Sequence, residues 1–265
     1  MSRNGLALAA GGVKGFAHIA VLKLLEELEL KIDVVTGSSA GSIVAALYAL
    51  HGDWQKVWKE FSEGVVEFLP AFMKRAEKLR GANLWSIFQR SLVKVEEYYP
   101  FFKKLFGKKK FSDCKIKLGI VVFDITELRS LLITEGFLVD AVMASSSVPG
   151  VFEAVWIAGD QVVDGGVAGH TPVREARKLG ADFIIASTFK KSASKLPIDQ
   201  MELMFYIDTW KEEKIKNHDL SFANLVIEHD LAINWYEFEK FKKVFETAVK
   251  SIEERRKEVE IIIRR

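Results

Sequence analysis

Hydrophobic residues along this chain fall into two patterns, short continuous runs and a three-to-four-residue spacing, and each predicts a different element. The runs predict strands near residues 5–9, 33–37, 116–123, 151–157, 161–164 and 183–187. Between the first two runs, Phe16, Ile19, Leu22, Leu25 and Leu28 recur at helical spacing, and a second helix is expected from 42 to 50. Together these elements predict a three-layer α/β/α sandwich with a mainly parallel central sheet.

The chain is long enough for one large α/β domain, and its composition excludes several classes of protein. Hydrophobic residues make up 49% of the 265 residues and the net charge is +2, which argues against disorder and against a strongly basic nucleic-acid binder. The single cysteine, Cys114, cannot form an intrachain disulfide, so a reducing compartment is favoured. No signal peptide and no apolar stretch of about 18 residues is visible. We therefore expect a cytoplasmic protein, at most peripheral at a membrane.

The segment Gly37-Ser38-Ser39-Ala40-Gly41 lies between a predicted strand and a predicted helix, which is the context of a nucleophile elbow. Such an elbow is a tight turn that holds a serine hydroxyl at the N-terminal end of a helix. The partial positive charge of that helix end favours a developing oxyanion. Glycines at both ends of the segment leave room for the turn and for a substrate. The alternative is a Gly/Ser-rich turn without chemistry.

A second glycine-rich segment, Gly11-Gly12-Val13-Lys14-Gly15, joins the first predicted strand to the first predicted helix. Free backbone N–H groups at the start of a helix can bind an anion. The segment lacks the Gly-Lys-Ser/Thr of a Walker A loop and the first glycine of a dinucleotide fingerprint. We therefore favour an oxyanion hole for Ser39, with the N–H groups of Gly11, Gly12 and Lys14 as donors, over a nucleotide-phosphate loop.

Asp164 ends the second strand of a predicted hairpin and is followed by Gly165 and Gly166. The hairpin is indicated by two short apolar runs on either side of Ala158-Gly159-Asp160. The two glycines leave the carboxylate at the rim of the sheet with little steric cover. Considered alone, Asp-Gly-Gly is more typical of a turn than of a catalytic group.

Together these segments resemble the patatin-like phospholipase family, in its bacterial single-domain form, over about residues 5–190. The resemblance rests on Gly11–Gly15 with His18, Gly37–Ser42, Ala144–Ser146 with Pro149-Gly150, and Asp164–Gly166. It implies a lipid acyl hydrolase with an α/β sandwich fold and a catalytic dyad of Ser39 and Asp164. The glycines that would support these motifs are Gly15, Gly37, Gly41, Gly165 and Gly166.

The chain departs from the family pattern at two places. Ala10 stands where the family loop usually begins with a further glycine, and Gly169-His170 replaces asparagines that are common before the proline. His170 follows six residues after Asp164, which makes it a candidate accessory residue and keeps a Ser-His variant open. The histidines and carboxylates show no ligand spacing such as His-x-x-x-His, so neither a metal nor a cofactor is expected.

A dyad also needs a chemical explanation, because a carboxylate with an ordinary pKa near 4 is a weak base. Partial desolvation raises the basicity of an aspartate, and oxyanion donors stabilise the charge that forms when serine attacks. The expected function is hydrolysis of a phospholipid, lysophospholipid or related acyl ester through an acyl-serine intermediate. A lipid- or protein-binding regulator with little turnover, and a peptidase or thioesterase using Ser39, remain alternatives.

Two regions outside the motifs are predicted to be helical. Residues 53–112 form an aromatic-rich insertion that ends in a basic run, Lys103-Lys104 and Lys108–Lys110. We expect its aromatic face to pack on the core; the other interpretation is a cap that lines an acyl-chain pocket and touches anionic membrane through its lysines. Residues 198–265 are expected to be a helical extension, with a charged, amphipathic surface helix from Glu237. No further domain is predicted within residues 1–265.

Overall fold

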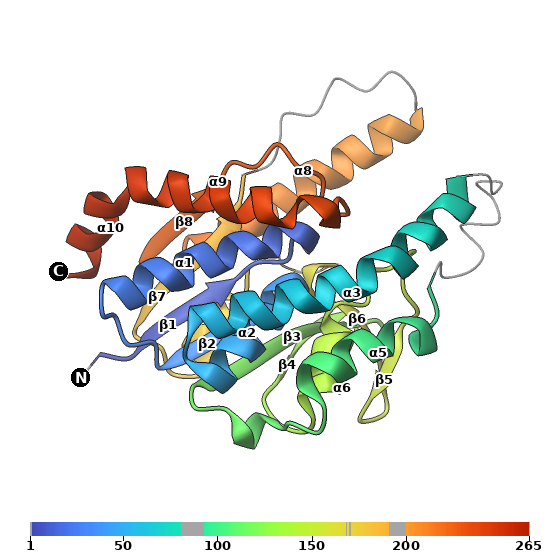
Figure 1. The fold of residues 1–265 in the computed structure, drawn as a ribbon, viewed down its shortest axis with the longest axis horizontal. Coiled ribbons are helices and arrows are strands. Elements are labelled where there is room, and N and C mark those ends of the chain that lie inside the picture. The colour runs from blue at the N-terminus through green and yellow to red at the C-terminus, as the bar shows by residue number, and fades with distance from the viewer. Residues whose placement is uncertain (1, 81–92, 168, 170, 191–199, 265) are drawn as a thin grey trace.

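An eight-stranded sheet, parallel in its main part, runs through the centre of the molecule (Figure 1). The structure is a computed structural model that describes residues 2–80, 93–167, 169, 171–190 and 200–264. Its strands are β1 (Asn4–Leu8), β2 (Val34–Ser38), β3 (Lys117–Asp124), β4 (Arg129–Ile133), β5 (Val155–Ile157), β6 (Asp160–Asp164), β7 (Phe183–Phe189) and β8 (Leu225–His229). Their order is β5-β6-β3-β2-β1-β7-β8, with β4 paired to β3. The predicted α/β class and mainly parallel sheet are confirmed.

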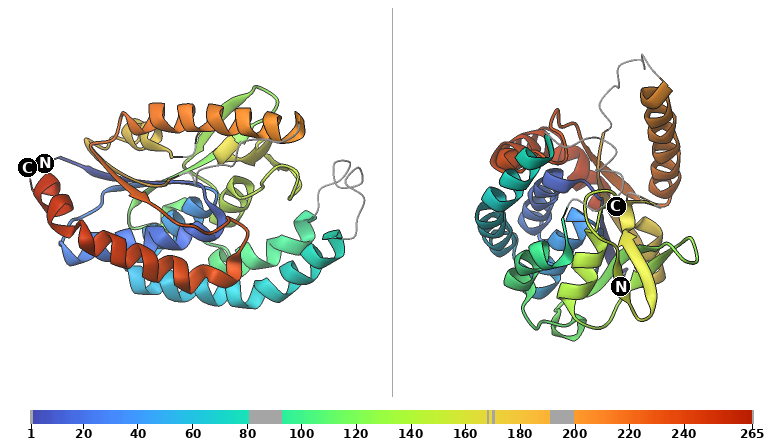
Figure 2. Two further views of the ribbon diagram at one scale, coloured as in Figure 1. Left: turned by 90° about the horizontal axis from the view of Figure 1, so that it is seen from above. Right: turned by 90° about the vertical axis from the view of Figure 1, so that its right-hand side faces the viewer.

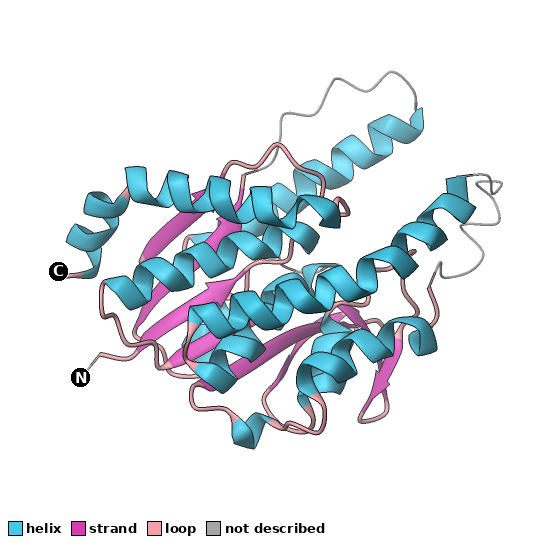
Figure 3. Cartoon of the chain, in the orientation of Figure 1, coloured by secondary structure: helices cyan, strands magenta, loops and turns pink. Residues whose placement is uncertain are grey.

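Helices cover both faces of the sheet (Figures 2 and 3). The described helices are α1 (Phe16–Glu27), α2 (Ala40–His51), α3 (Trp54–Arg80), α5 (Val95–Phe106), α6 (Leu138–Ser145), α7 (Val173–Lys178), α8 (Gln200–Leu220), α9 (Phe241–Glu254) and α10 (Arg256–Ile263). In Figure 2, α7 and α8 lie on one face, and α1, α3 and α9 lie on the other. The result is the three-layer arrangement that the sequence predicts.

Alternation along the strands divides the core between the two faces. Leu6, Leu8 and Val35 belong to the larger cluster, with α1 and α2, whereas Ala7 and Val34 belong to the smaller one, with α7. Side chains of a strand alternate between faces, so each strand contributes to both clusters. This explains why the strands are nearly continuous apolar runs.

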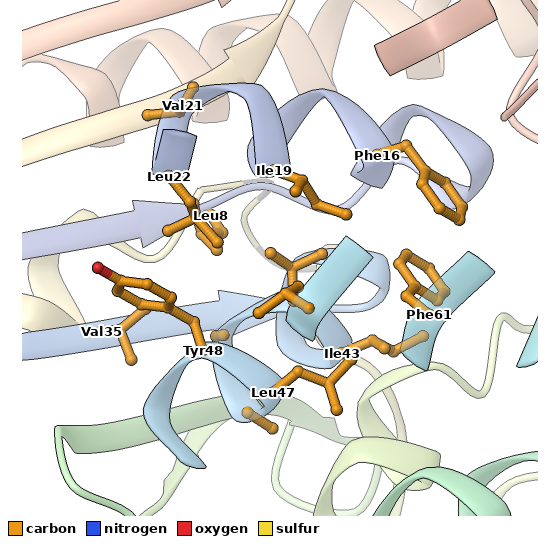
Figure 4. Packing of buried hydrophobic residues seen from close by; sticks show 14 of the residues in the cluster. Leu8, Phe16, Ile19, Val21, Leu22, Val35, Ile43, Leu47, Tyr48 and Phe61 are labelled. Carbon is orange, nitrogen blue, oxygen red and sulfur yellow. The ribbon is translucent and has the colours of Figure 1, made fainter. Parts of the chain in front are cut away.

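The larger cluster joins the motif-bearing core to the aromatic insertion. Phe16 of α1 stacks on Phe61 of α3 with ring centroids 4.2 Å apart, and Figure 4 shows the two rings facing each other. Phe61 and Val65, four residues apart on α3, are both buried. On α5, Tyr98, Phe102 and Phe106 are buried in the same cluster. The aromatic face of the insertion therefore packs on the core, as expected.

Two expectations need correction, and one strand, β4, was not expected. β8 lies inside the segment 198–265 that was expected to be helical, where it adds to the edge of β7. β4 was not predicted; it returns antiparallel to β3 after a turn in which Leu128 has a φ of 51°. The expected strand at 151–157 is shortened to β5, Val155–Ile157. All three are short strands, and β4 and β8 each mix apolar with charged or polar residues.

The C-terminal surface helix is two helices rather than one, α9 and α10, with one buried face. Val244, Ala248 and Ile252 of α9 are buried while charged residues occupy its outer side. α9 packs along α1, so the chain end covers the first helix of the core (Figure 1). The amphipathic character expected from Glu237 onwards is thus used for packing.

Candidate active site

Ser39 occupies a strained turn between β2 and α2. Its backbone φ is 52° and its ψ is −127°, a conformation that costs a non-glycine residue about 1–3 kcal/mol. A Cβ on Gly41 would overlap the carbonyl oxygens of Leu8 and Ala9 at the end of β1. The turn therefore fits closely against the neighbouring strand, and only glycine fits at position 41. Ser39 itself is 7% exposed.

The Ser39 turn is held in place by the hydroxyl of Ser145, at the end of α6. The backbone N–H of Ser39 donates to Ser145 Oγ at 2.9 Å, and Ser145 Oγ donates to the Val121 carbonyl of β3 at 2.6 Å. On its other side the Ser39 carbonyl accepts from the backbone N–H of Ser42 at 2.8 Å and from Ser42 Oγ at 2.6 Å. Both peptide groups of the strained residue are thus fixed.

Asp164 comes beside Ser39 because β2 and β6 share one edge of β3. β4 pairs with residues 120–124 of β3, whereas β2 pairs with residues 117–121 and β6 with residues 122–124. Both β2 and β6 thus share residues of β3 with β4, and a strand has only two edges. β4 therefore occupies one edge, and β2 and β6 lie end to end along the other. Ser38 pairs with Val121, and Asp164 pairs with the next residue, Val122. The carboxyl ends of β2 and β6 meet there, with Ser39 and Asp164.

The residues around Asp164 fix its position at this junction. The Asp164 N–H donates to the Ser147 carbonyl at 3.0 Å, and Asp164 Oδ1 accepts from the Gly166 N–H at 2.7 Å. A Cβ on Gly165 would lie 2.8 Å from Ser38 Oγ, so the chain after Asp164 runs directly against the Ser39 turn. Asp164 is 4% exposed, which makes it a largely desolvated carboxyl group.

The glycine-rich loop forms the third side of the site. Gly12 has a φ of 56°, and a Cβ there would overlap the Trp235 carbonyl oxygen. That carbonyl accepts from the Val13 N–H at 2.8 Å, and the Lys14 N–H donates to the Gly11 carbonyl at 3.1 Å. The N–H groups of Gly11 and Gly12 donate no hydrogen bond within the described part of the chain. Of the three expected donors, Lys14 is therefore the one already engaged in closing the loop.

The loop also contacts the other two segments. A Cβ on Gly15 would lie 2.7 Å from Ala40 Cβ, next to Ser39, and a Cβ on Gly166 would lie 2.9 Å from Ala10 Cβ. Residues 10–15, 39–40 and 164–166 thus converge at one end of the sheet. These are the three segments that the sequence singles out.

A buried chain of polar side chains that the sequence analysis did not identify lies under the glycine-rich loop. His18 Nε2 contacts the Ala9 carbonyl at 2.9 Å, His18 Nδ1 contacts Ser187 Oγ at 2.7 Å, and Ser187 Oγ contacts His229 Nε2 at 3.2 Å. Since a carbonyl only accepts, His18 carries its proton on Nε2. Ser187 then donates to His18 and accepts from His229.

Both histidines in this chain are neutral near pH 7. Burial lowers the pKa of His18 to about 4. Burial, and then the charges of His18 and Arg255, lower the pKa of His229 to about 3. His18 appears in the sequence motif, but its partner Ser187 lies 169 residues further along the chain, and His229, the partner of Ser187, lies 42 residues beyond that. Such long-range partners give no local sequence signal.

An apolar pocket opens over Ser39. Its volume is about 780 Å³, including the open mouth. The lining residues are Gly12, Ser39, Ala40, Ile43, Phe61, Val65, Phe68, Leu69, Tyr98, Phe101, Phe102, Ser146, Val148, Phe152, Trp235 and Phe238. Most are aromatic or aliphatic, and many come from α3 and α5. The insertion therefore packs on the core and also lines a pocket, while the lysines at 103, 104 and 108–110 are exposed.

Some predicted features lie outside the described residues. His170 is one of them, as are residues 81–92 of the insertion. No helix in the described ranges is both long enough and apolar enough to span a membrane.

Comparison with known proteins places the motifs in a family. A family model described as patatin-like phospholipase matches residues 6–177. The protein named Lysophospholipase NTE1 from Pyricularia oryzae is 30% identical over 188 residues, which cover 69% of this chain and 12% of that protein. The protein of the same name from Coccidioides immitis is 30% identical over 190 residues, with 69% and 11% covered. The chain thus matches only a small part of these much longer relatives.

A solved structure supports the fold. The crystal structure of VipD from Legionella pneumophila superposes with a TM-score of 0.55 at 12% sequence identity, covering 97% of this chain and 67% of that one. At this identity the likeness concerns the fold alone.

Proposed function

Because the chain belongs to the patatin-like phospholipase family, we propose that it hydrolyses the acyl ester of a phospholipid or lysophospholipid through an acyl-serine intermediate. The observation that carries the proposal is the meeting of Ser39 and Asp164 along one edge of β3, at an apolar pocket lined by Ser39. A serine hydroxyl is a poor nucleophile near pH 7 and needs a base within reach. Asp164 is the base in this proposal.

In the first half-reaction, Ser39 Oγ attacks the ester carbonyl carbon while Asp164 accepts its proton. The negative charge that forms on the carbonyl oxygen is stabilised by the N–H groups of Gly11 and Gly12, and by the N-terminal end of α2. The Lys14 N–H serves as a third donor only if its 3.1 Å bond to Gly11 lengthens. Collapse of the tetrahedral intermediate breaks the bond to the alcohol, which takes the proton from Asp164.

In the second half-reaction, water replaces the alcohol. Asp164 accepts a proton from the water as it attacks the acyl-serine, and the same donors hold the second oxyanion. The proton then returns to Ser39, and the fatty acid leaves. Low exposure of Asp164 favours its role as a base, because desolvation disfavours the charged form of a carboxyl group.

The pocket favours a single acyl chain as the group bound next to Ser39. Its walls are formed largely by phenylalanines and aliphatic residues of α2, α3 and α5, and such a surface binds hydrocarbon by excluding water. The names of the NTE1 relatives point to lysophospholipids. We propose a single-chain lipid as the first substrate to test, presented at a membrane or micelle surface.

A substrate panel tests the proposal. The parent protein is expected to release fatty acid from lysophosphatidylcholine or from phosphatidylcholine vesicles, and Ser39→Ala and Asp164→Asn are each expected to lose most of this activity. Ser130→Ala and Asp230→Asn, which change exposed residues, are the matched controls. Cleavage of peptides or acyl thioesters without lipid ester cleavage would favour another serine hydrolase. Saturable lipid binding with no turnover would favour a regulator.

A further inference from the structure

The hydroxyl of Ser146 is buried and has no hydrogen-bond partner among the described residues. Buried hydroxyl groups in folded proteins are normally paired, because an unpaired one has lost its bonds to water without replacement. Ser146 lines the same pocket as Ser39, and most other residues of that pocket are apolar. An unpaired polar group of this kind at a substrate pocket calls for a partner that the substrate supplies.

Ser146 lies in a three-residue segment that connects the nucleophile to the base. On one side, the hydroxyl of Ser145 accepts a hydrogen bond from the Ser39 N–H at 2.9 Å. On the other side, the backbone carbonyl of Ser147 accepts one from the Asp164 N–H at 3.0 Å. The segment begins at Ser145, which is the last residue of α6. Ser146 is therefore fixed between the two residues that carry out the proposed chemistry.

This segment approaches Ser39 from the side opposite the glycine-rich loop. The loop follows β1, which pairs with one edge of β2, whereas Ser145 bonds Val121 of β3, on the other edge of β2. If the loop holds the carbonyl oxygen of the ester, the remaining ester oxygen faces the β3 side. That oxygen belongs to the alcohol, and Asp164 must also reach it to return the proton.

We propose that Ser146 is a catalytic residue that donates a hydrogen bond to the leaving-group oxygen during formation of the acyl-serine. The proposal rests on the hydrolase function proposed above. No hydrogen bond to a described residue holds the Ser146 side chain in its present rotamer, so rotation about χ1 can turn the hydroxyl toward the pocket. As the carbon–oxygen bond to the alcohol breaks, the electron pair goes to the alcohol oxygen. Ser146 stabilises that charge until the proton arrives from Asp164, and itself exchanges no proton.

A pair of esters with the same fatty acid and different alcohols tests this role. The p-nitrophenyl ester has a weakly basic leaving group that needs little stabilisation, whereas the ethyl ester has a strongly basic one. In Ser146→Ala, kcat/KM for the ethyl ester is expected to fall about tenfold more than for the p-nitrophenyl ester. We compare kcat/KM because this quantity reports the steps up to release of the alcohol. Any loss of folded protein lowers kcat/KM for both esters equally, so it cancels in the ratio of the two values.

Two further measurements separate catalysis from a structural role. Ser146→Thr keeps the hydroxyl and is expected to restore the parent's ratio between the two esters. The melting temperature of Ser146→Ala is expected to be equal to or above that of the parent, because the removed hydroxyl has no partner. A lower melting temperature with equal losses on both esters would show a structural role and overturn the proposal.

Each remaining outcome is also decisive. Unchanged kcat/KM on the ethyl ester would overturn the role of Ser146 while leaving the hydrolase function intact. Equal losses at an unchanged melting temperature would assign the hydroxyl to the oxyanion and overturn the leaving-group role. A parent protein that cleaves neither ester and releases no fatty acid from lysophosphatidylcholine would overturn both proposals together.

Discussion

The strained backbone of Ser39 is held in place by a contact with a residue far along the chain. The positive φ of Ser39 is unfavourable for a side chain with a Cβ, and the hydroxyl of Ser145 provides the bond that fixes its N–H. The sequence motif identifies the turn but gives no information on this support, because Ser145 lies 106 residues away. The segment Ala144–Ser146 was part of the family resemblance, and the contacts of Ser145 now give it a physical role.

Ser145→Ala is expected to lower both stability and turnover. It removes the partner of the buried Ser39 N–H and of the Val121 carbonyl, so the free energy of unfolding should fall by about 1–3 kcal/mol. With the turn less firmly held, kcat should decrease while KM changes little. Urea unfolding and ester kinetics measure the two effects, with Ser130→Ala as the control. Parent-like values of both quantities would show that the bond does not support the turn.

His170→Ala separates the dyad from a Ser-His variant. If Asp164 is the only base, the substitution should change kcat/KM by less than about tenfold, well short of the 10²–10⁴ contributed by a general base. The measurement is ester hydrolysis by the purified variant beside Ser39→Ala. A loss as large as that of Ser39→Ala would make His170 the base instead.

At the scale of elements, the strongest local patterns were predicted and the short edge strands were not. β1, β2, β3, β6 and β7 follow from apolar runs, and α1 from its spacing. β4 and β8 are short and their residues are partly exposed, so their pairing partners rather than their own sequence determine them. The meeting of Ser39 and Asp164 was implied by family resemblance alone. The structural cause of this meeting is that β2 and β6 share one edge of β3. That arrangement depends on which strands pair with each other, and the sequence of a single strand does not specify it.

The packing of α3 against α5 predicts a way to change acyl-chain preference. Val65 is 3% exposed and lines the pocket, whereas its neighbour Val66 is 57% exposed. Val65→Phe should fill part of the pocket and lower kcat/KM for long acyl chains at least about tenfold more than for short ones, at a cost of about 1–3 kcal/mol in stability.

Val66→Phe adds the same ring on the outer side of the same helix and is the control for Val65→Phe. A series of esters from short to long fatty acids measures both variants. If the two variants share one chain-length profile, or if Val65→Phe lowers all chain lengths equally, the acyl chain does not lie in this pocket.

At the scale of the whole molecule, the His18–Ser187–His229 chain joins α1, β7 and β8, and therefore links the beginning, the later core and the C-terminal part of the sequence. The pKa values of both histidines are lowered in the folded protein, to about 4 and about 3, against about 6.5 when unfolded. Between these values the unfolded chain binds more protons than the folded one. Stability should therefore fall as the pH falls below about 6.5.

The expected slope is up to about 1.4 kcal/mol per pH unit for each histidine between pH 6 and 4.5. Replacing His229 by Gln should flatten the slope, whereas His218→Gln, which changes an exposed histidine, should not. Urea unfolding at several pH values gives the slopes. Parallel pH profiles for the parent and His229→Gln would mean that the buried histidine does not govern acid stability.

The measurement that tests the central claim most directly is covalent labelling by a fluorophosphonate, followed by peptide mass spectrometry. This probe reacts with an activated serine and requires no knowledge of the natural lipid. We predict one adduct per chain, on the peptide that contains Ser39, and labelling at least about a hundredfold slower in Asp164→Asn, since a general base contributes about 10²–10⁴. A parent protein that remains unlabelled, that is labelled at another residue, or that reacts equally fast without Asp164 would contradict the Ser39–Asp164 dyad.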